Sequence, residues 1–263
     1  MFTGLSAFPL TPMNEHGIQE REFIHLVEHL AAAGVDSIGV LGSTGNYAYL
    51  SVAERARVAS LSVENAGTVP VVVGIGALRT RDVLANAERA QQAGASGLLL
   101  APVSYQKLTD DEVYDLYATV SRSLSVPLCV YDNPGTTHFD FSDELHGRIA
   151  QLPQVRSIKI PPVVNDSEKA RERVVRLRAL IPSEVTIGIS GDPAAATGLN
   201  AGCDAWYSVI GGLYPRTALA LTRAAQAGDT QQANALSSAL EPLWALYREY
   251  GGSLRVAATI AEV

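Results

Sequence analysis

The chain has 263 residues, of which 47% are hydrophobic, and its formal net charge is −7. This composition excludes a disordered chain, and no apolar run reaches the ~18 residues of a membrane-spanning helix. The acidic balance argues against nucleic acid or an anionic membrane as a partner. The first residues, Met1–Gly4, lack the basic segment of a signal peptide. We therefore expect a cytoplasmic protein.

Short apolar runs alternate with helical patterns along the chain. The runs predict strands at Leu5–Phe8, Ser37–Leu41, Val69–Gly74, Gly97–Ala101, Pro127–Tyr131, Val155–Ile160, Thr186–Ser190 and Ala205–Val209. The helical patterns lie near 20–33, 51–66, 80–93, 110–123, 142–151, 167–181, 192–200 and 215–227. Eight such pairs, with strands apolar throughout, predict a (β/α)8 TIM barrel over residues 1–228. An open doubly wound sheet is the alternative, but the Rossmann glycine fingerprint is missing.

The pattern is purely helical after residue 228. It covers Thr230–Tyr250 and resumes after Gly251-Gly252. We expect residues 229–263 to form a C-terminal helical extension. Because the chain stops at Val263 without a capping signal, we expect this extension to be incomplete.

Two sets of residues invite a metal or disulfide interpretation. His25-Leu26-Val27-Glu28-His29 has the H-x-x-E-H spacing of zinc proteases. However, an apolar stripe formed by Phe23, Val27 and Leu30 leaves both histidines on the solvated side of the helix, so we expect no metal. Cys129 and Cys203 lie among apolar or small residues without a CxxC partner, and we expect buried, reduced thiols.

Only three of the 20 basic residues are lysines, and one of them lies on a predicted strand. Lys107 lies in a polar loop and Lys169 on a charged helix, whereas Lys159 is flanked by Ile158 and Ile160. A buried lysine is either paired with a carboxylate or present as the free amine, which is the nucleophile needed to form a Schiff base. Both readings of Lys159 stay open at this point.

The residues just after the predicted strands are the next candidates, because TIM barrels place their chemistry there. Tyr131 ends its strand and is either a proton shuttle or an aromatic cap of the core. Gly42-Ser43-Thr44-Gly45 is either a cradle for a carboxylate or phosphate, or a plain turn. In Ser190-Gly191-Asp192, we expect Asp192 to cap the following helix rather than to help bind phosphate.

Taken together, these residues resemble the dihydrodipicolinate synthase / N-acetylneuraminate lyase family. The matching pieces run in the family's order along the chain: Thr3-Gly4, Thr11-Pro12-Met13, Gly42-Ser43-Thr44-Gly45, Gly74-Ile75-Gly76-Ala77, Tyr131-Asp132-Asn133-Pro134-Gly135, Lys159, Ser190-Gly191-Asp192 and Ser208. The resemblance implies a barrel with a helical extension, no cofactor, and a homo-oligomer arranged as a dimer of dimers. It also implies a class I lyase whose lysine forms a Schiff base with pyruvate or another 2-keto acid.

The resemblance assigns roles by position. It implies Lys159 as the Schiff-base lysine, Tyr131 as the proton-relay tyrosine, Ser43 as the relay hydroxyl, Tyr105 as the tyrosine that reaches an adjacent subunit's site, and Thr44, with Gly42 beside it, as part of the keto-acid carboxylate site. Tyr207 falls where the family has an aliphatic residue lining the keto-acid pocket.

Three positions depart from the family pattern. Asn46 stands where the family usually has Glu, and Ser104 replaces the first of a common Tyr-Tyr pair. Thr136 stands where true dihydrodipicolinate synthases bind the second substrate's carboxylate with Arg, and a hydroxyl cannot make that bidentate contact. The Schiff-base residues are therefore complete, while the second-substrate side is changed.

We therefore hypothesise C–C cleavage, condensation or sugar-acid dehydration through an iminium. Two alternatives stay open. One is the condensation of pyruvate with aspartate semialdehyde that gives the family its name. The other is a non-catalytic relative that only binds a keto acid.

Overall fold

The computed structural model describes residues 1–163 and 166–261, and its centre is a closed barrel of eight parallel strands. The strands are β1 (Gly4–Ala7), β4 (Ser37–Val40), β5 (Val71–Gly74), β6 (Gly97–Leu100), β7 (Leu128–Tyr131), β8 (Val155–Ile160), β9 (Thr186–Ile189) and β10 (Ala205–Ser208). Each pairs with the next in the sequence, and β10 closes on β1. The predicted TIM barrel is confirmed.

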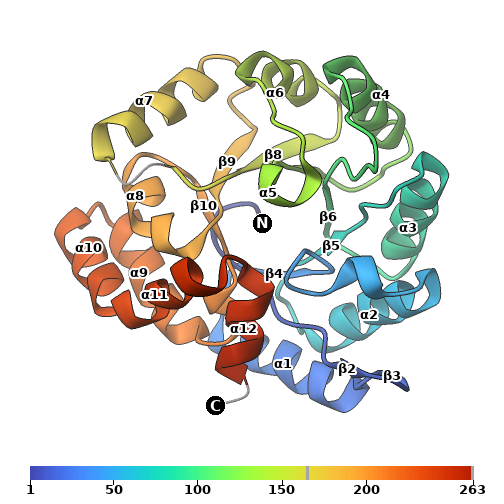
Figure 1. Ribbon diagram of the computed structural model, residues 1–263, viewed down its shortest axis with the longest axis horizontal. Helices are drawn as coiled ribbons and strands as arrows, with labels where there is room; N and C mark the ends of the chain where they lie inside the picture. Colours follow the sequence, from blue (N-terminus) through green and yellow to red (C-terminus); the bar gives the residue numbers. More distant parts are fainter. Residues whose placement is uncertain (164–165, 262–263) are drawn as a thin grey trace.

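Helices form a ring around this barrel (Figure 1). They are α1 (Glu20–Ala33), α2 (Val52–Asn65), α3 (Thr80–Gln92), α4 (Asp110–Ser121), α6 (Asp143–Ala150), α7 (Ser167–Arg178), α8 (Ala195–Asn200) and α9 (Pro215–Gln226). Capping boxes at Ser51 and Thr109 begin α2 and α4, and the left-handed Gly34 ends α1. No helix in the described ranges combines the length and the apolar character needed to cross a membrane.

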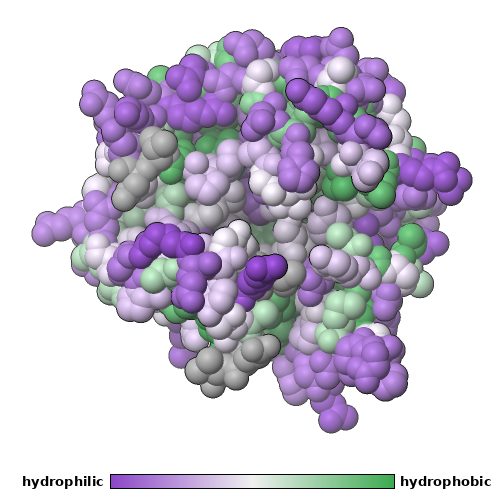
Figure 2. Space-filling view, viewed as in Figure 1, coloured by the Kyte–Doolittle hydropathy of each residue, from purple (hydrophilic) through white to green (hydrophobic). Residues whose placement is uncertain are grey.

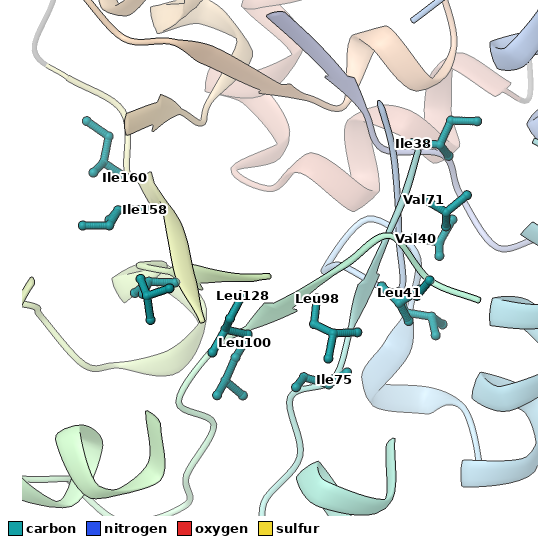
Figure 3. Close-up of a cluster of buried hydrophobic side chains, with 14 of the residues drawn as sticks. Ile38, Val40, Leu41, Val71, Ile75, Leu98, Leu100, Leu128, Ile158 and Ile160 are labelled. Atoms are coloured by element: carbon teal, nitrogen blue, oxygen red, sulfur yellow. The ribbon is translucent and has the colours of Figure 1, made fainter. Parts of the chain in front are cut away.

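Alternation along the strands divides the apolar residues into two cores. Residues such as Ile38, Leu98 and Ile158 point outward and pack under the helices, as Figure 3 shows. Inside the barrel lies a smaller cluster: Phe2, Phe8, Val72, Leu99, Ala101, Cys129, Tyr131, Ala205 and Tyr207. Successive side chains on a strand face opposite sides of the sheet. The pairing register of the strands therefore decides which residues point into the lumen.

The segment after residue 228 forms three helices, α10 (Thr230–Ala239), α11 (Glu241–Tyr250) and α12 (Ser253–Ala261). The expected continuous stretch over Thr230–Tyr250 is broken at Leu240, because Pro242 begins a new helix there. The helix α10 packs against α8 and α9. Val263, on which the expectation of an incomplete extension rests, lies outside the described residues.

Several short elements differ from the sequence prediction. A hairpin of β2 (Met13–Asn14) and β3 (Gly17–Ile18) follows β1, and the turn at Pro134-Gly135 is a single helical turn, α5 (Pro134–Thr137). Short 3-10 helices lie at Tyr47–Tyr49, Asp192–Ala194 and Ile210–Gly212.

The expectation that Asp192 caps the following helix is wrong. Gly191 is the N-cap of the 3-10 helix Asp192–Ala194, and the Asp192 carboxylate is buried. It accepts hydrogen bonds from Trp206 Nε1 at 3.0 Å, from the Ile210 backbone N–H at 2.7 Å and from the Tyr247 hydroxyl. The carboxylate turns inward because those donors lie on β10, on the 3-10 helix that follows it and on α11, and it thereby ties α11 to the barrel.

Candidate active site

A lysine amino group lies inside the barrel, near the C-terminal end of β8. Lys159 and Ser157 point into the lumen, because Ile158 and Ile160 between and beyond them face the helices. In the sheet, Lys159 is the register partner of Tyr131 on β7. Its side chain is 5% exposed, and Nζ lies 4.0 Å from the Tyr131 ring centroid and 4.4 Å from that of Phe8. None of the ion pairs found within residues 1–163 and 166–261 includes Lys159. Aromatic rings, rather than a paired carboxylate, therefore surround its amino group.

The hydroxyl of Tyr131 is held by two side chains, one that follows β7 and one that follows β4, which is not adjacent to β7 in the barrel. Asn133 Nδ2 donates to Tyr131 Oη at 2.9 Å, and Ser43 Oγ lies 3.4 Å from the same oxygen. Asn133 Nδ2 also lies 3.4 Å from Ser43 Oγ, so the three groups form a closed triangle. Sequence reasoning missed Asn133. Its position two residues after Tyr131, which puts it on the same side of an extended chain, was the available signal.

The segment that carries Ser43 and Thr44 has an unusual backbone. Leu41 and Asn46, on either side, adopt left-handed φ values of 57° and 59°. Such conformations cost on the order of 1 kcal/mol each outside glycine and persist only where surrounding contacts fix them. One such contact is at Gly74, where a Cβ atom would lie 1.9 Å from the Leu41 carbonyl oxygen. Ser43 and Thr44 are therefore presented on a rigid turn.

A buried arginine supports the same side of the barrel. Arg55 donates to the backbone oxygens of Gly74 and Gly76, both at 2.9 Å, and its guanidinium lies 5.3 Å from the Tyr47 ring centroid. Burial lowers the pKa of Arg55 to about 10. This cation is already committed to the backbone beneath the site.

Tyr207 closes the lumen below Lys159. Its hydroxyl lies 2.7 Å from Ser157 Oγ and accepts from Cys129 Sγ at 3.4 Å. Its ring meets Phe8 edge-on, and burial raises the pKa of its phenol. On β9, a Cβ at Gly188 would lie 2.1 Å from the Tyr207 ring, so only glycine fits there. The floor of the site is therefore tightly packed.

A buried acid–base pair lies behind Tyr131. His146 Nε2 on α6 is 3.4 Å from Asp132 Oδ2, and the imidazole stacks on Phe141 with ring centroids 4.9 Å apart. Asp132 donates its backbone N–H to the Lys159 carbonyl at 3.0 Å. The pair thus joins α6 to the backbone that carries Tyr131 and Lys159.

One cavity of about 410 Å³ opens above these groups. It is lined by Phe8, Ser43, Thr44, Asn46, Tyr47, Ala48, Tyr49, Tyr131, Asn133, Gly135, Thr136, Lys159, Pro162, Ser190, Gly191, Tyr207, Val209, Gly251 and Gly252. Six of the eight residues expected at the site line it. Gly42 does not: its Cα faces Phe8. Tyr105 does not either, and its side chain is 91% exposed.

The zinc alternative finds no support in the geometry. His25, Glu28 and His29 lie exposed on α1, as predicted, whereas Phe23 and Val27 are buried. Throughout the part of the chain that the structure describes, no group of three His, Cys, Asp or Glu residues is arranged to hold a metal ion.

This barrel is that of a class I lyase. The model of the dihydrodipicolinate synthetase family matches residues 1–261. A solved dihydrodipicolinate synthase from Agrobacterium tumefaciens str. C58 is 45% identical and superposes with a TM-score of 0.95, covering 99% of this chain and 88% of that chain. The 4-hydroxy-tetrahydrodipicolinate synthase of Methylococcus capsulatus is 33% identical over 89% of this chain and 79% of its own length. A dihydrodipicolinate synthase from Acinetobacter baumannii, solved with pyruvate, is 26% identical, with a TM-score of 0.85 over 94% of this chain and 84% of that one. The chain belongs to the dihydrodipicolinate synthetase family.

Proposed function

We propose that this chain is a lyase that forms a Schiff base between Lys159 and pyruvate or a closely related 2-keto acid. The observation that carries the proposal is the position of the Lys159 amino group, which is buried in the lumen, surrounded by aromatic rings and open to a cavity on one side. An amine held away from carboxylates is free to attack a carbonyl carbon.

In the proposed reaction, the lysine nitrogen attacks the keto carbon, and a proton transferred to the keto oxygen gives a carbinolamine. Loss of water then gives an iminium. In cleavage, the substrate hydroxyl loses its proton while the iminium accepts the electron pair of the breaking C–C bond, and the resulting enamine is protonated at carbon to give the iminium of the keto acid. In the reverse direction, that iminium loses a proton from carbon to give the enamine, which attacks the carbonyl of a second substrate, and the carbonyl oxygen takes up a proton. Hydrolysis of the iminium returns the keto acid and the free lysine.

Tyr131 is the proposed proton carrier. Its ring lies against the Lys159 amino group, and its hydroxyl is linked to Ser43, which offers a path for the proton toward the cavity. Asn133 donates to the same hydroxyl, and so fixes the direction of its lone pairs. We assign Asn133 as a positioning residue.

The keto-acid carboxylate is proposed to bind at Ser43-Thr44, where the rigid turn offers hydroxyls and backbone N–H groups. Tyr207 beneath Lys159 limits the size of the keto acid's carbon chain. A small keto acid is also what the A. baumannii relative was solved with, namely pyruvate.

We also propose that the protein is a cytoplasmic homo-oligomer, as a dimer of dimers. Tyr105 and Leu78 are both strongly exposed, which is unusual for large apolar side chains and fits a surface covered by a second copy. In such an oligomer, Tyr105 would reach the site of its neighbour. Two free, buried cysteines fit a reducing compartment.

The test is the release of pyruvate from a panel of 2-keto-3-deoxy acids and hydroxy-keto acids. We expect turnover of at least one by the wild type, and a loss on the order of 10⁴-fold or more in Lys159→Arg, as for other covalent nucleophiles. Lys169→Arg is the matched control, because that lysine lies exposed on α7. Equal activity of Lys159→Arg and the wild type would contradict the proposal.

A second candidate function is the condensation of pyruvate with aspartate semialdehyde, which the names of the relatives favour. It uses the same Schiff base and differs in the second substrate. A coupled assay with aspartate semialdehyde distinguishes the two. Binding of pyruvate without turnover of any acceptor or sugar acid would instead indicate a non-catalytic relative.

A further inference from the structure

The part of the cavity that a second substrate would occupy is nearly without charge. Above Lys159 and Tyr131, the walls are formed by the side chains of Asn46, Tyr49, Thr136 and Ser190 and by the backbone at Gly251-Gly252. Among the described lining residues, Lys159 is the only one with a charged side chain. Figure 2 shows strongly hydrophilic residues mostly toward the rim of this face and paler ones around its centre, with one strongly hydrophilic group close to the centre.

The one lining cation is not available to a second substrate. In the proposed reaction its nitrogen becomes part of the iminium with the keto acid. That positive charge lies beside the carboxylate of the keto acid itself. Among the described lining residues, a second carboxylate higher in the cavity would therefore find no counter-charge of its own.

Neighbouring arginines do not fill this gap. Arg55 is buried and donates to two backbone oxygens. Arg173 and Arg176 pair with Asp143 and lie outside the lining of this cavity. Arg255 is exposed on α12 and is also not among the lining residues.

The electrostatics of such a cavity disfavour an anion. A carboxylate bound here gives up part of its hydration without gaining a charged partner among the described lining residues, whereas a hydroxyl or carbonyl needs only one hydrogen bond. Asn46, Thr136 and Ser190 offer such hydrogen bonds, and Tyr49 offers an aromatic face. The groups present fit an uncharged molecule.

We propose that the second carbonyl compound, the one added to or released from the enamine, is an uncharged aldehyde. The proposal rests on the proposed Schiff-base function and adds the chemical class of its second substrate. It excludes acceptors that carry a carboxylate at the far end, such as an amino-acid semialdehyde.

Two acceptors that differ in little more than charge test this directly: succinic semialdehyde and its methyl ester, each with pyruvate. We expect the ester to be used with a kcat/KM at least about tenfold higher, which corresponds to ~1.4 kcal/mol. Glyceraldehyde and benzaldehyde, added as further arms, tell a hydroxylated from an aromatic acceptor, and use of either supports the proposal. A preference for the acid over its ester would overturn it, as would turnover of no uncharged aldehyde.

A variant sharpens the result. Thr136→Arg places a guanidinium at the cavity wall, so we expect the preference to shift toward succinic semialdehyde. Thr217→Arg adds the same charge on the exposed side of α9 and should leave the preference unchanged. If Thr136→Arg does not fold, the wild-type ratio alone decides.

Failure of this inference is distinguishable from failure of the proposed function. A separate portion of each protein is treated with pyruvate and borohydride in the absence of any acceptor. An adduct together with a preference for the anionic acceptor sinks only the inference about charge. Absence of the adduct from folded wild-type protein sinks the Schiff-base function itself.

Discussion

The floor and the mouth of the cavity are built in different ways. At the floor, Lys159, Tyr131 and Tyr207 come from strands and are buried, and neighbouring side chains hold the two tyrosine hydroxyls. At the mouth, Tyr49 and Thr136 come from short turns and are exposed. A rigid floor suits a reaction step that needs fixed geometry, whereas exposed turns can change without disturbing the barrel. In this chain the described lining residues at the mouth carry no charged side chain, whereas Lys159 and Tyr131 lie together at the floor.

The largest effect that separates the two regions is expected from Tyr131→Phe. The variant removes the Tyr131 hydroxyl but keeps the ring that lies against the Lys159 amino group. We expect kcat to fall about 10²–10⁴-fold, the range for loss of a positioned acid–base group. Steady-state kinetics of pyruvate release measure it. Tyr49→Phe at the mouth is the control, and we expect its kcat to change less than threefold. Equal losses of kcat in both variants would contradict the proposed difference between the floor and the mouth.

A smaller effect is expected from Asn133→Ala. The variant removes one neutral hydrogen bond to Tyr131 Oη, so we expect kcat to fall about 3–10-fold. Because Asn133 acts through Tyr131, the KM for pyruvate should change less than twofold and the pH profile of kcat should shift. Asn14→Ala, in the distant β2–β3 hairpin, should change neither. A rise in KM with kcat unchanged would show that Asn133 contacts the keto acid instead.

The C-terminal helix α11 is attached to the barrel near the mouth through Tyr247, and Tyr247→Phe tests how much this attachment stabilises the fold. Its hydroxyl donates to the buried Asp192 carboxylate, and a hydrogen bond to a charged acceptor contributes about 1.5–3 kcal/mol. We expect the free energy of unfolding to fall by that amount near pH 7, measured by urea denaturation. Tyr250→Phe, at the end of the same helix, is the matched control.

The pH dependence of this loss has a defined sign. Burial raises the pKa of Asp192, against the opposing hydrogen bond from Tyr247. An acid with a raised pKa in the folded state holds its proton there while the unfolded chain is ionised, so its contribution to stability falls as pH rises above ~4. The Tyr247→Phe loss should therefore become smaller as the pH is lowered and Asp192 takes up its proton. A loss that does not depend on pH would contradict this assignment.

The smallest expected effect concerns the two thiols. Burial raises the pKa of Cys129, in the floor, and that of Cys203 to about 12. Since the thiolate is the reactive form, neither should react with a disulfide reagent near pH 8 until the chain is unfolded in urea. Rapid, stoichiometric labelling of the folded protein would mean that the floor opens.

The sequence predicts the floor better than the mouth, for a physical reason. Alternation along β8 decides that Lys159 and Ile158 face opposite sides, and that pattern is readable from residue types alone. The role of Asn133 depends on the conformation of the chain after β7, and that of Asp192 on donors from β10 and α11. Such long-range contacts have no local signal, which is why Asp192 was wrongly expected to cap a helix.

Borohydride trapping tests the central claim most directly. The folded protein is incubated with pyruvate, reduced, digested and analysed by mass spectrometry. The account predicts one pyruvate-dependent adduct per chain, on the peptide that contains Lys159, and no adduct in Lys159→Arg. An unmodified Lys159 in folded protein, or equal labelling of the exposed Lys169, would contradict it.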